Sequence, residues 1–345
     1  MQQHKVETNQ KLLDKNGNIA EAGYATKQVW QYDRKDIKAS KMRIKEWDYY
    51  IITNQKYALA LTIADNGFAG AISASFIDYE KAVDITKTAI FPFPLGKMGF
   101  PSTPDIGDIA ATIGKVEMTF SNDGKTRRLY GVYPKFGKNK EMLVCDITLT
   151  EFPKDSLVIA TPFVEDKHFY YNQKTNCMRA EGFFKIGNEE FTFNPADSLG
   201  TLDWGRGVWT YDNTWYWGSF QAIQPDGTNL GWNIGYGFGN NTAASENMVF
   251  VNGVAHKLDE VTFNIPEKDG KDDYMSKWTF SSNDGRFEMD FVPLIDRQAP
   301  LNLGFLMMIP HQVFGKFTGK IKLDDGKIIE VKDLIGFAEK VHNKW

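Results

Sequence analysis

The residues best suited to chemistry gather in one stretch of the chain, residues 202–238. It opens with Asp203 and Arg206, with Trp204 and Trp209 close by in the sequence. A carboxyl group among tryptophan rings loses hydration, which raises its pKa and suits it to donate a proton near neutral pH. Arg206 would oppose this by favouring the carboxylate. The pair therefore indicates either a catalytic acid with a modulating cation, or a salt bridge or turn that fixes a loop.

Two alternating segments follow and define a predicted pocket. A strand over residues 214–222 would place on one face Trp215, Trp217, Ser219 and Gln221. The next segment carries on one face Leu230, Trp232, Ile234, Tyr236 and Phe238, and on the other Gly231, Asn233, Gly235, Gly237 and Gly239. A strand face so rich in glycine leaves room for something bulky. The occupant is either neighbouring tryptophan rings or a ligand with Trp215 and Trp217 as walls.

Further polar residues complete the predicted site. Glu246 and His311 are the other candidates for the proton donor, although a turn-closing carboxylate or a core histidine would have the same residue types. The predicted catalytic residues are Asp203, Arg206, Glu246 and His311. The predicted ligand-binding residues are Trp204, Trp209, Trp215, Trp217, Ser219, Asn233, Asn247 and His256.

No metal site and no cofactor are expected. The five histidines lack the spacing of metal ligands on a strand or helix. The glycines of residues 235–239 lie within an alternating segment and do not open a helix, so they are no dinucleotide fingerprint. Neither a phosphate-binding loop nor a nucleophile elbow is present. Cys145 and Cys177 have no Cys-x-x-Cys spacing and are expected to be free, buried thiols.

Composition and charge set the broad class. A chain of 345 residues predicts two domains, and 42% hydrophobic with 24% charged residues is typical of a globular protein. The net charge of −4 and the mixing of signs give no electrostatic support for nucleic-acid binding. No run approaches the roughly 20 apolar residues of a membrane span. Residues 1–13 lack the apolar stretch of a signal peptide, so a cytoplasmic location is predicted.

The elements that must position these residues are predicted to be strands. Short alternating segments are separated by Asn-Gly and Asp-Gly pairs, and aromatic residues, which strands favour, reach 14%. Residues 248–251 and 254–258 flank Asn252-Gly253, and residues 320–323 and 327–331 flank another turn. Each arrangement predicts a β-hairpin.

The two halves of the sequence also echo each other. Residues 119–125 parallel residues 279–286, and Trp47 can be set against Trp215. The predicted fold is therefore all-β, with two tandem lipocalin-like barrel or sandwich halves packed side by side. The predicted domains are residues 1–175 and residues 176–345, with the boundary where residues 172–176 interrupt the strands. The pocket is expected in the second half, and the interior of the first is expected to be filled with side chains.

The motifs resemble a known family over nearly the whole chain. They are residues 45–50, 203–207, 215–219, 246–247, 256–258, 311–315 and 336–345. In this combination they are similar to the bacterial family called domain of unknown function 2804. More distantly, that family resembles the carotenoid hydratase and tocopherol cyclase group, which has two lipocalin-like barrel halves. That resemblance implies an acid in an aromatic-lined pocket that protonates an isoprenoid double bond, a part that Asp203 could take.

Three functions stay open at this point. The first is acid-catalysed hydration, cyclisation or isomerisation of an apolar isoprenoid or lipid-like molecule, by a lyase or isomerase. The second is a non-catalytic carrier or sensor of a hydrophobic ligand, whose pocket would hold no titratable group near the ligand. The third is carbohydrate binding or processing. The expected partner in the first two is a small apolar molecule.

Overall fold

The computed structural model describes residues 3–302, 304 and 306–345, and nearly all of its regular elements are strands. Apart from a single 3₁₀ turn, η1 (Arg34–Asp36), the described part of the chain forms no helix. No helix in these residues could cross a membrane. The all-β prediction is confirmed.

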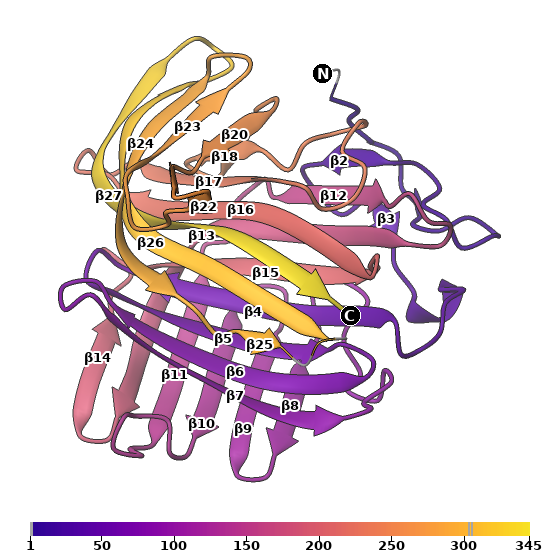
Figure 1. Cartoon of the computed structure of the whole chain (residues 1–345), viewed down its shortest axis with the longest axis horizontal. Coiled ribbons are helices and arrows are strands. Elements are labelled where there is room, and N and C mark those ends of the chain that lie inside the picture. Colours follow the sequence, from indigo (N-terminus) through magenta and orange to yellow (C-terminus); the bar gives the residue numbers. More distant parts are fainter. Residues whose placement is uncertain (1–2, 303, 305) are drawn as a thin grey trace.

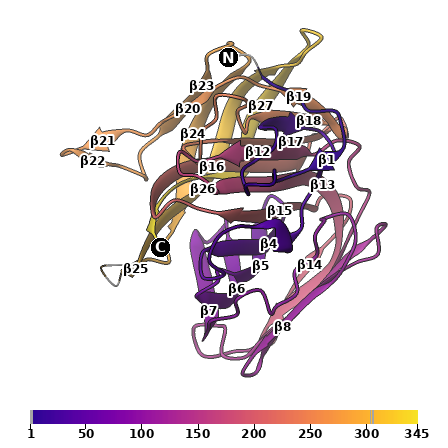
Figure 2. The ribbon, with the colours of Figure 1, turned by 90° about the vertical axis from the view of Figure 1, so that its right-hand side faces the viewer.

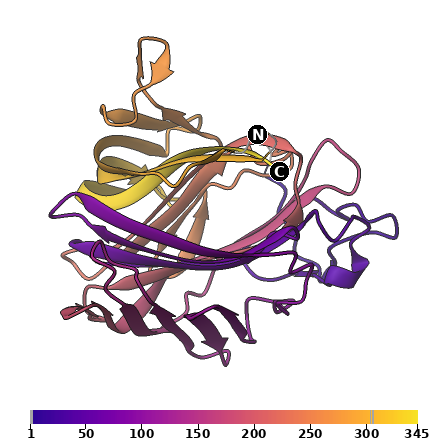
Figure 3. The ribbon, with the colours of Figure 1, turned by 60° about the horizontal axis from the view of Figure 1, so that its bottom comes forward.

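The first sheet is a meander that curves into a nearly closed ten-strand barrel (Figure 1). One side consists of β4 (Ile44–Thr53), β5 (Tyr57–Asp65), β6 (Ala69–Asp78) and β7 (Val83–Pro92). The other consists of β8 (Ile109–Ile113), β9 (Val116–Asn122), β10 (Arg127–Tyr133), β11 (Leu143–Thr150), β13 (Phe169–Ile186) and β15 (Leu199–Val208). In Figure 3 the purple strands β4–β7 and the magenta strands β8–β11 lie on opposite sides of the interior.

Shorter strands extend this barrel. β2 (Gly23–Ala25) pairs with β12 (Leu157–Pro162), which pairs with one end of β13, and β14 (Glu189–Phe193) pairs with the other end. β1 (Gln10–Lys11) and β3 (Trp30–Gln31) form a separate two-stranded sheet.

The second sheet follows the same plan as a nine-strand half-barrel. Its path contains β16 (Asp212–Ile223), β17 (Asn229–Tyr236), β18 (Met248–Val251), β19 (Val254–Lys257), β20 (Val261–Asn264), β23 (Trp278–Ser282), β24 (Phe287–Arg297), β26 (Met307–Lys322) and β27 (Ile328–Lys344). β25 (Leu301–Asn302) adds to β26, and β21 (Glu267–Lys268) with β22 (Lys271–Asp272) forms a projecting hairpin (Figure 2).

The two sheets share one topology. In each, the first four strands pair in sequence order, β4 to β7 and β16 to β19, and the last strand returns to pair with the first: β15 with β4, and β27 with β16. β13, β15 and β4 lie beside β16, β17 and β27, so the sheets pack side by side (Figures 1 and 2). The prediction of two related barrel-like halves is confirmed.

The chain passes from the first sheet to the second between Val208 and Asp212. Residues 172–176 do not interrupt the strands as expected; they are the buried middle of β13. Their polar side chains suggested a loop, but these side chains pair with partners on neighbouring strands. Residue 175 therefore lies within a strand, and the division of the chain after it stays a prediction.

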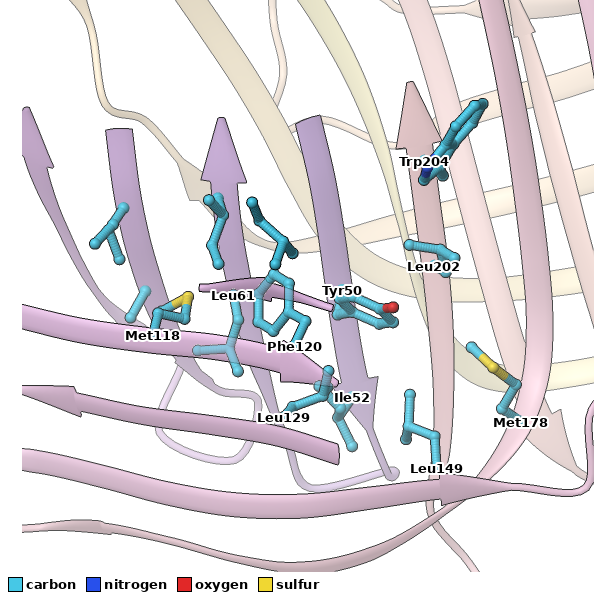
Figure 4. Packing of buried hydrophobic residues seen from close by; sticks show 14 of the residues in the cluster. Tyr50, Ile52, Leu61, Met118, Phe120, Leu129, Leu149, Met178, Leu202 and Trp204 are labelled. Carbon is cyan, nitrogen blue, oxygen red and sulfur yellow. The ribbon is translucent and has the colours of Figure 1, made fainter. Parts of the chain in front are cut away.

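Side chains fill the interior of the first barrel, as expected (Figure 4). Tyr50, Leu61, Phe120, Leu129 and Leu202 are among the buried residues that meet there from different strands. The second sheet has its own core, which includes Trp232, Trp278, Phe280, Phe291 and Phe317.

The predicted hairpin around Asn252-Gly253 is confirmed. Both turn residues have positive φ, 49° and 77°, as the tight turn of a two-residue hairpin requires. The predicted hairpin near residue 325 is also present, although its strands β26 and β27 extend much further than the pattern indicated.

Candidate functional site

β15 has two faces of different chemistry, because side chains alternate along a strand. Trp204 belongs to the core of the first barrel, and Arg206 stacks on its ring at 4.0 Å. Asp203 points the other way, where it meets Lys174. The salt bridge considered between Asp203 and Arg206 is wrong, because residues three apart in a strand lie on opposite faces.

Arg206 is fully buried among main-chain and side-chain acceptors of the first barrel. Its Nη1 donates to Asp48 Oδ1 at 3.0 Å and to the carbonyl of Trp47 at 2.8 Å. Its Nε lies 3.8 Å from Glu46 Oε1. These contacts tie β15 to β4, so the structure gives Arg206 and Trp204 positions inside the barrel and away from Asp203.

Asp203 forms a buried ion pair between the two sheets. Lys174 Nζ lies 2.9 Å from Asp203 Oδ1, and Asn172 Nδ2 donates to the same oxygen at 2.6 Å. Lys174, Asp203 and Tyr49 occupy one row across β13, β15 and β4, because they are paired at the Cα level. The Lys174 ammonium lies 3.9 Å above the ring of Trp217 on the second sheet. The ion pair thus contacts an aromatic wall from the other half.

Trp217 begins a chain of hydrogen bonds that leads to Glu246. Its Nε1 donates to Asn233 Oδ1 at 2.6 Å, and Asn233 Nδ2 donates to the carbonyl of Glu246 at 2.7 Å. Asn247 Oδ1 accepts from the amide of Gly235 at 2.8 Å. The segment after β17 is therefore held against the glycine-rich face of that strand, and the predicted residues Trp217, Asn233, Glu246 and Asn247 are brought together.

Glu246 has the most perturbed carboxyl group of the site. Burial, with a smaller contribution from the nearby Asp203 charge, raises its pKa to about 7. The ammonium groups of Lys174 and Lys257 and a hydrogen bond with the Tyr170 hydroxyl oppose the rise. Because its pKa is near neutrality, Glu246 can both hold and release a proton under physiological conditions, which is the property of a general acid.

A third carboxyl group, that of Glu339 on β27, lies in the same region. It accepts from Trp215 Nε1 at 3.1 Å and from Gln312 Nε2 at 2.9 Å, and burial raises its pKa. In the described part of the chain, no cationic side chain comes within 4 Å of the Glu246 or Glu339 carboxylates. The site thus holds more carboxyl groups than directly paired cations.

Aromatic rings form one wall beside these carboxyl groups. Trp209 contacts Trp47 at a centroid distance of 5.2 Å, Trp215 at 6.0 Å and Phe238 at 4.9 Å, in edge-to-face arrangements. Tyr170 stacks on Trp47 at 6.2 Å. The predicted ligand-binding residues Trp209 and Trp215 therefore lie together, and Tyr170 joins this wall to Glu246.

Gly205 explains why the segment Asp203–Gly207 contains glycine. A Cβ atom at Gly205 would lie 1.9 Å from Cζ2 of Trp47, so the absence of a side chain lets that ring lie across β15. A tryptophan ring is one of the two predicted occupants of the space over the glycines of residues 231–239. The structure instead has the Trp47 ring over Gly205 of β15, in the first sheet.

The glycine face of β17 is occupied differently from either expectation. A Cβ atom at Gly231 would lie 2.6 Å from Cys177 Sγ, in the irregular part of β13, and one at Gly235 would meet the carbonyl oxygen of Tyr216. The space beside Gly231 is therefore filled neither by a tryptophan ring nor by a ligand cavity, but by the Cys177 side chain. The small residues there allow β13 and β17 to approach closely.

Ser219 lies further along the same interface. Its Oγ accepts from Asn176 Nδ2 at 3.0 Å, and it lines a small cavity with Thr201, Gln221, Phe314 and Phe337. The cavity volume of about 10 Å³ is close to the room that one water molecule needs. Ser219 thus contributes to the packing of the two sheets, beside the carboxyl groups of Asp203, Glu246 and Glu339, which are called the carboxyl cluster below.

The two predicted histidines lie elsewhere. His256 Nδ1 is 3.0 Å from Asp324 Oδ2 on an exposed edge. His311 Nδ1 is 2.8 Å from Asp296 Oδ2, and its ring stacks on Tyr274 with 3.8 Å between centroids. His311 neighbours Gln312 in β26, so its side chain points to the opposite face from the one that meets Glu339. The structure does not bring either histidine to the carboxyl cluster.

Sequence reasoning missed Tyr49, Tyr170, Asn172, Lys174 and Glu339. No alternation marked this segment, because residues 170–176 are all tyrosines or polar residues, and both faces of the strand are buried. No group of three His, Cys, Asp or Glu side chains within the described ranges could hold a metal ion, and Cys145 and Cys177 are free, buried thiols.

Comparisons with known proteins agree with this architecture. The family described as "Domain of unknown function (DUF2804)" matches residues 3–345. No curated protein matches the chain. Among solved structures, kievitone hydratase from Nectria haematococca is 12% identical, with 97% of this chain and 98% of that one covered and a TM-score of 0.49. A Nitrosomonas europaea protein assigned as AttH is 11% identical, with 91% and 96% covered and a TM-score of 0.50. At such identity the latter likeness concerns the fold alone.

Proposed function

We propose that this chain, which belongs to the DUF2804 family, binds a small apolar molecule between its two sheets and transfers a proton to it. The observation that carries the proposal is the Glu246 carboxyl group. It is buried, its pKa is raised to about 7, and it lies beside Tyr170 and the aromatic wall. A general acid needs a pKa near the working pH and a site from which bulk water is excluded.

The acid in this proposal is Glu246 rather than Asp203. Two donors, Lys174 and Asn172, point at one oxygen of Asp203, so this carboxyl group is already engaged in an ion pair and a hydrogen bond. Glu246 lacks a directly paired cation. Asp203 would then act as a positioning residue that holds the Lys174 ammonium against Trp217 and adds negative charge near Glu246.

The proposed step adds the Glu246 proton to one carbon of a double bond. The π electrons form the new carbon–hydrogen bond, and positive charge develops on the neighbouring carbon beside electron-rich ring faces such as that of Trp215. Water can then add and release a proton, which gives hydration. Loss of a proton from a neighbouring carbon gives isomerisation, and attack by a second double bond followed by that loss gives cyclisation. In each case the Glu246 carboxylate takes the proton back.

The titratable groups weigh against a carrier. A non-catalytic carrier or sensor needs no buried acid near its ligand, whereas this site has three carboxyl groups, those of Asp203, Glu246 and Glu339. Carbohydrate binding has less support, because the rings of the aromatic wall pack edge to face against one another. Such packing offers few open ring faces on which a sugar could stack.

The test begins with native mass spectrometry of the gently purified protein, followed by extraction of any bound molecule. That compound is then incubated with the protein in D₂O, and carbon-bound deuterium is measured after back-exchange in water. We expect about one deuterium per turnover, and a turnover rate that falls tenfold per pH unit above about pH 7, because the protonated fraction of Glu246 falls.

Two variants decide whether Glu246 is the acid. Glu246→Gln keeps the shape and removes the proton, so we expect a loss of about 10²–10⁴-fold in turnover. His311→Asn is the matched control and leaves turnover unchanged. If the wild-type protein returns its ligand unmodified after long incubation, the carrier function is correct instead. Unchanged turnover in Glu246→Gln would reject Glu246 as the donor.

A further inference from the structure

Two buried polar atoms flank the Asp203 ion pair without a hydrogen-bond partner among the residues that the structure describes. Asn172 is completely buried, and its Nδ2 donates to Asp203, so its Oδ1 points away from that carboxylate as an unused acceptor. The Tyr49 residue is partly buried, but its hydroxyl oxygen is shielded from solvent and has no hydrogen-bond partner within the described residues, although Gln312 lies near it. These two residues therefore offer one acceptor and one hydroxyl donor, and the Trp209 Nε1 donor of the aromatic wall also lacks a partner in the described part of the chain.

Their positions place both atoms in the proposed binding site. Tyr49 pairs with Asp203 across β4 and β15, and Asn172 lies two residues before Lys174 on the same face of β13. The ring of Tyr49 packs edge-on against Trp217 at 5.9 Å. Gly205 is paired with Asn172 on one side and with Trp47 on the other, and the Trp47 ring covers it, so an indole ring lines this part of the site.

The energetics favour a ligand that satisfies both atoms. A buried polar atom left unpaired costs about 1–3 kcal/mol, and a ligand that seals the site without pairing these atoms bears that cost. A pure hydrocarbon can pair neither. A carbonyl oxygen can accept from Tyr49 but cannot donate to Asn172. A hydroxyl group can do both, because it is a donor and an acceptor.

We infer that the molecule bound at this site carries at least one hydroxyl group, as an otherwise apolar alcohol or phenol, which Asn172 and Tyr49 recognise. The inference deepens the proposed function and rests on it for the location of the site. It separates an oxygenated substrate from a hydrocarbon isoprenoid. Discrimination of this kind is strong, because a site built to pair a hydroxyl group rejects analogues that lack it.

Isothermal titration calorimetry of the full chain with matched probe pairs tests the inference. The pairs are 2-naphthol with 2-methylnaphthalene, and farnesol with farnesene. We expect the alcohol of at least one pair to bind about tenfold tighter than its hydrocarbon partner. The reason is that the free-energy cost of leaving one buried polar atom unpaired is equivalent to about a tenfold change in the dissociation constant. Equal binding within the pairs, or no binding of either alcohol, overturns the inference.

Tyr49→Phe removes only the hydroxyl group and should reduce the preference to about threefold. Tyr50→Phe is the matched control, because Tyr50 is the next residue on β4 and its hydroxyl accepts from Arg127 inside the first barrel. A preference that Tyr49→Phe leaves intact counts against the inference. Preferred binding of the alcohols without deuterium uptake in any assay would reject proton transfer and leave the hydroxyl recognition standing.

Discussion

The interior of the first barrel and the interface between the two sheets both bury charges among aromatic rings, yet they differ in how those charges are paired. In the barrel, Asp48 and Glu46 lie against Arg206, and Glu46 also meets Arg34. In the interface, Lys174 pairs with Asp203 alone, while Glu246 and Glu339 depend on neutral donors.

This difference teaches that burial of charge does not mark a functional site by itself. A paired cation opposes the rise in pKa that burial causes, as Arg206 does for Asp48, whose pKa burial still raises, and such a pair serves the fold. A buried carboxyl group without a cation keeps its proton instead, and that proton is available for chemistry. The two regions share β15, so one strand supplies a structural face with Arg206 and a candidate functional face with Asp203.

The largest expected effect comes from breaking the barrel network. Arg206→Leu would leave Asp48 and Glu46 without their buried cation, so we expect the free energy of unfolding to fall by about 3–5 kcal/mol in urea denaturation. Lys174→Met is the matched change in the interface. Asp203 keeps its bond from Asn172 there, and the expected loss is about 1–3 kcal/mol. Equal losses in the two variants would remove the distinction between the regions.

The pH dependence of stability sharpens the comparison. Folded Glu246 keeps its proton up to about pH 7, whereas the unfolded carboxyl group loses it near 4.5. Between these values the folded state binds more protons, so the free energy of unfolding decreases as pH rises. Relative to Glu246→Gln, the wild-type protein should lose about 3 kcal/mol across this range and change little above it. A difference between the two proteins that does not vary from pH 4.5 to pH 7 would contradict the assignment.

A smaller effect is expected where the barrel and the aromatic wall meet. Gly205→Ala would force the Trp47 ring from its place across β15, at a cost of about 1–3 kcal/mol in unfolding free energy. The same variant should weaken binding of the preferred naphthalene or farnesyl probe, because Trp47 supports the wall of the site. Gly131→Ala serves as the control, since its nearest atom is the Cys145 sulfur at 3.1 Å inside the barrel. If Gly205→Ala leaves the probe affinity unchanged, Trp47 does not support the wall of the binding site.

The smallest effect is expected at the two histidines. His256→Asn and His311→Asn should change probe affinity less than twofold, because their partners Asp324 and Asp296 lie outside the carboxyl cluster. Unfolding free energies should shift by about 1 kcal/mol or less for these partly exposed ion pairs. A tenfold loss of probe affinity in either variant would extend the site beyond the interface.

Local patterns were sufficient for much of the fold. Alternation and Asn-Gly turns predicted strands and hairpins such as the one around Asn252, and the repeat of Trp47 in Trp215 indicated two related halves. These features depend on neighbours a few residues apart, so the sequence carries them directly. The same patterns selected Trp215, Trp217, Asn233 and Glu246, which the structure brings together.

By itself, the sequence determined the class of the fold, several of its turns and the alternation of faces in strands such as β16 and β17, but not the course of β13 through residues 172–176. Only the tertiary structure decided that Asp203 meets Lys174 rather than Arg206, and that Glu246 lacks a paired cation. These outcomes depend on which strands from distant parts of the chain pack together. The pKa of a buried carboxyl group is set by such neighbours and by the loss of water, and neither is written in the residues beside it along the chain.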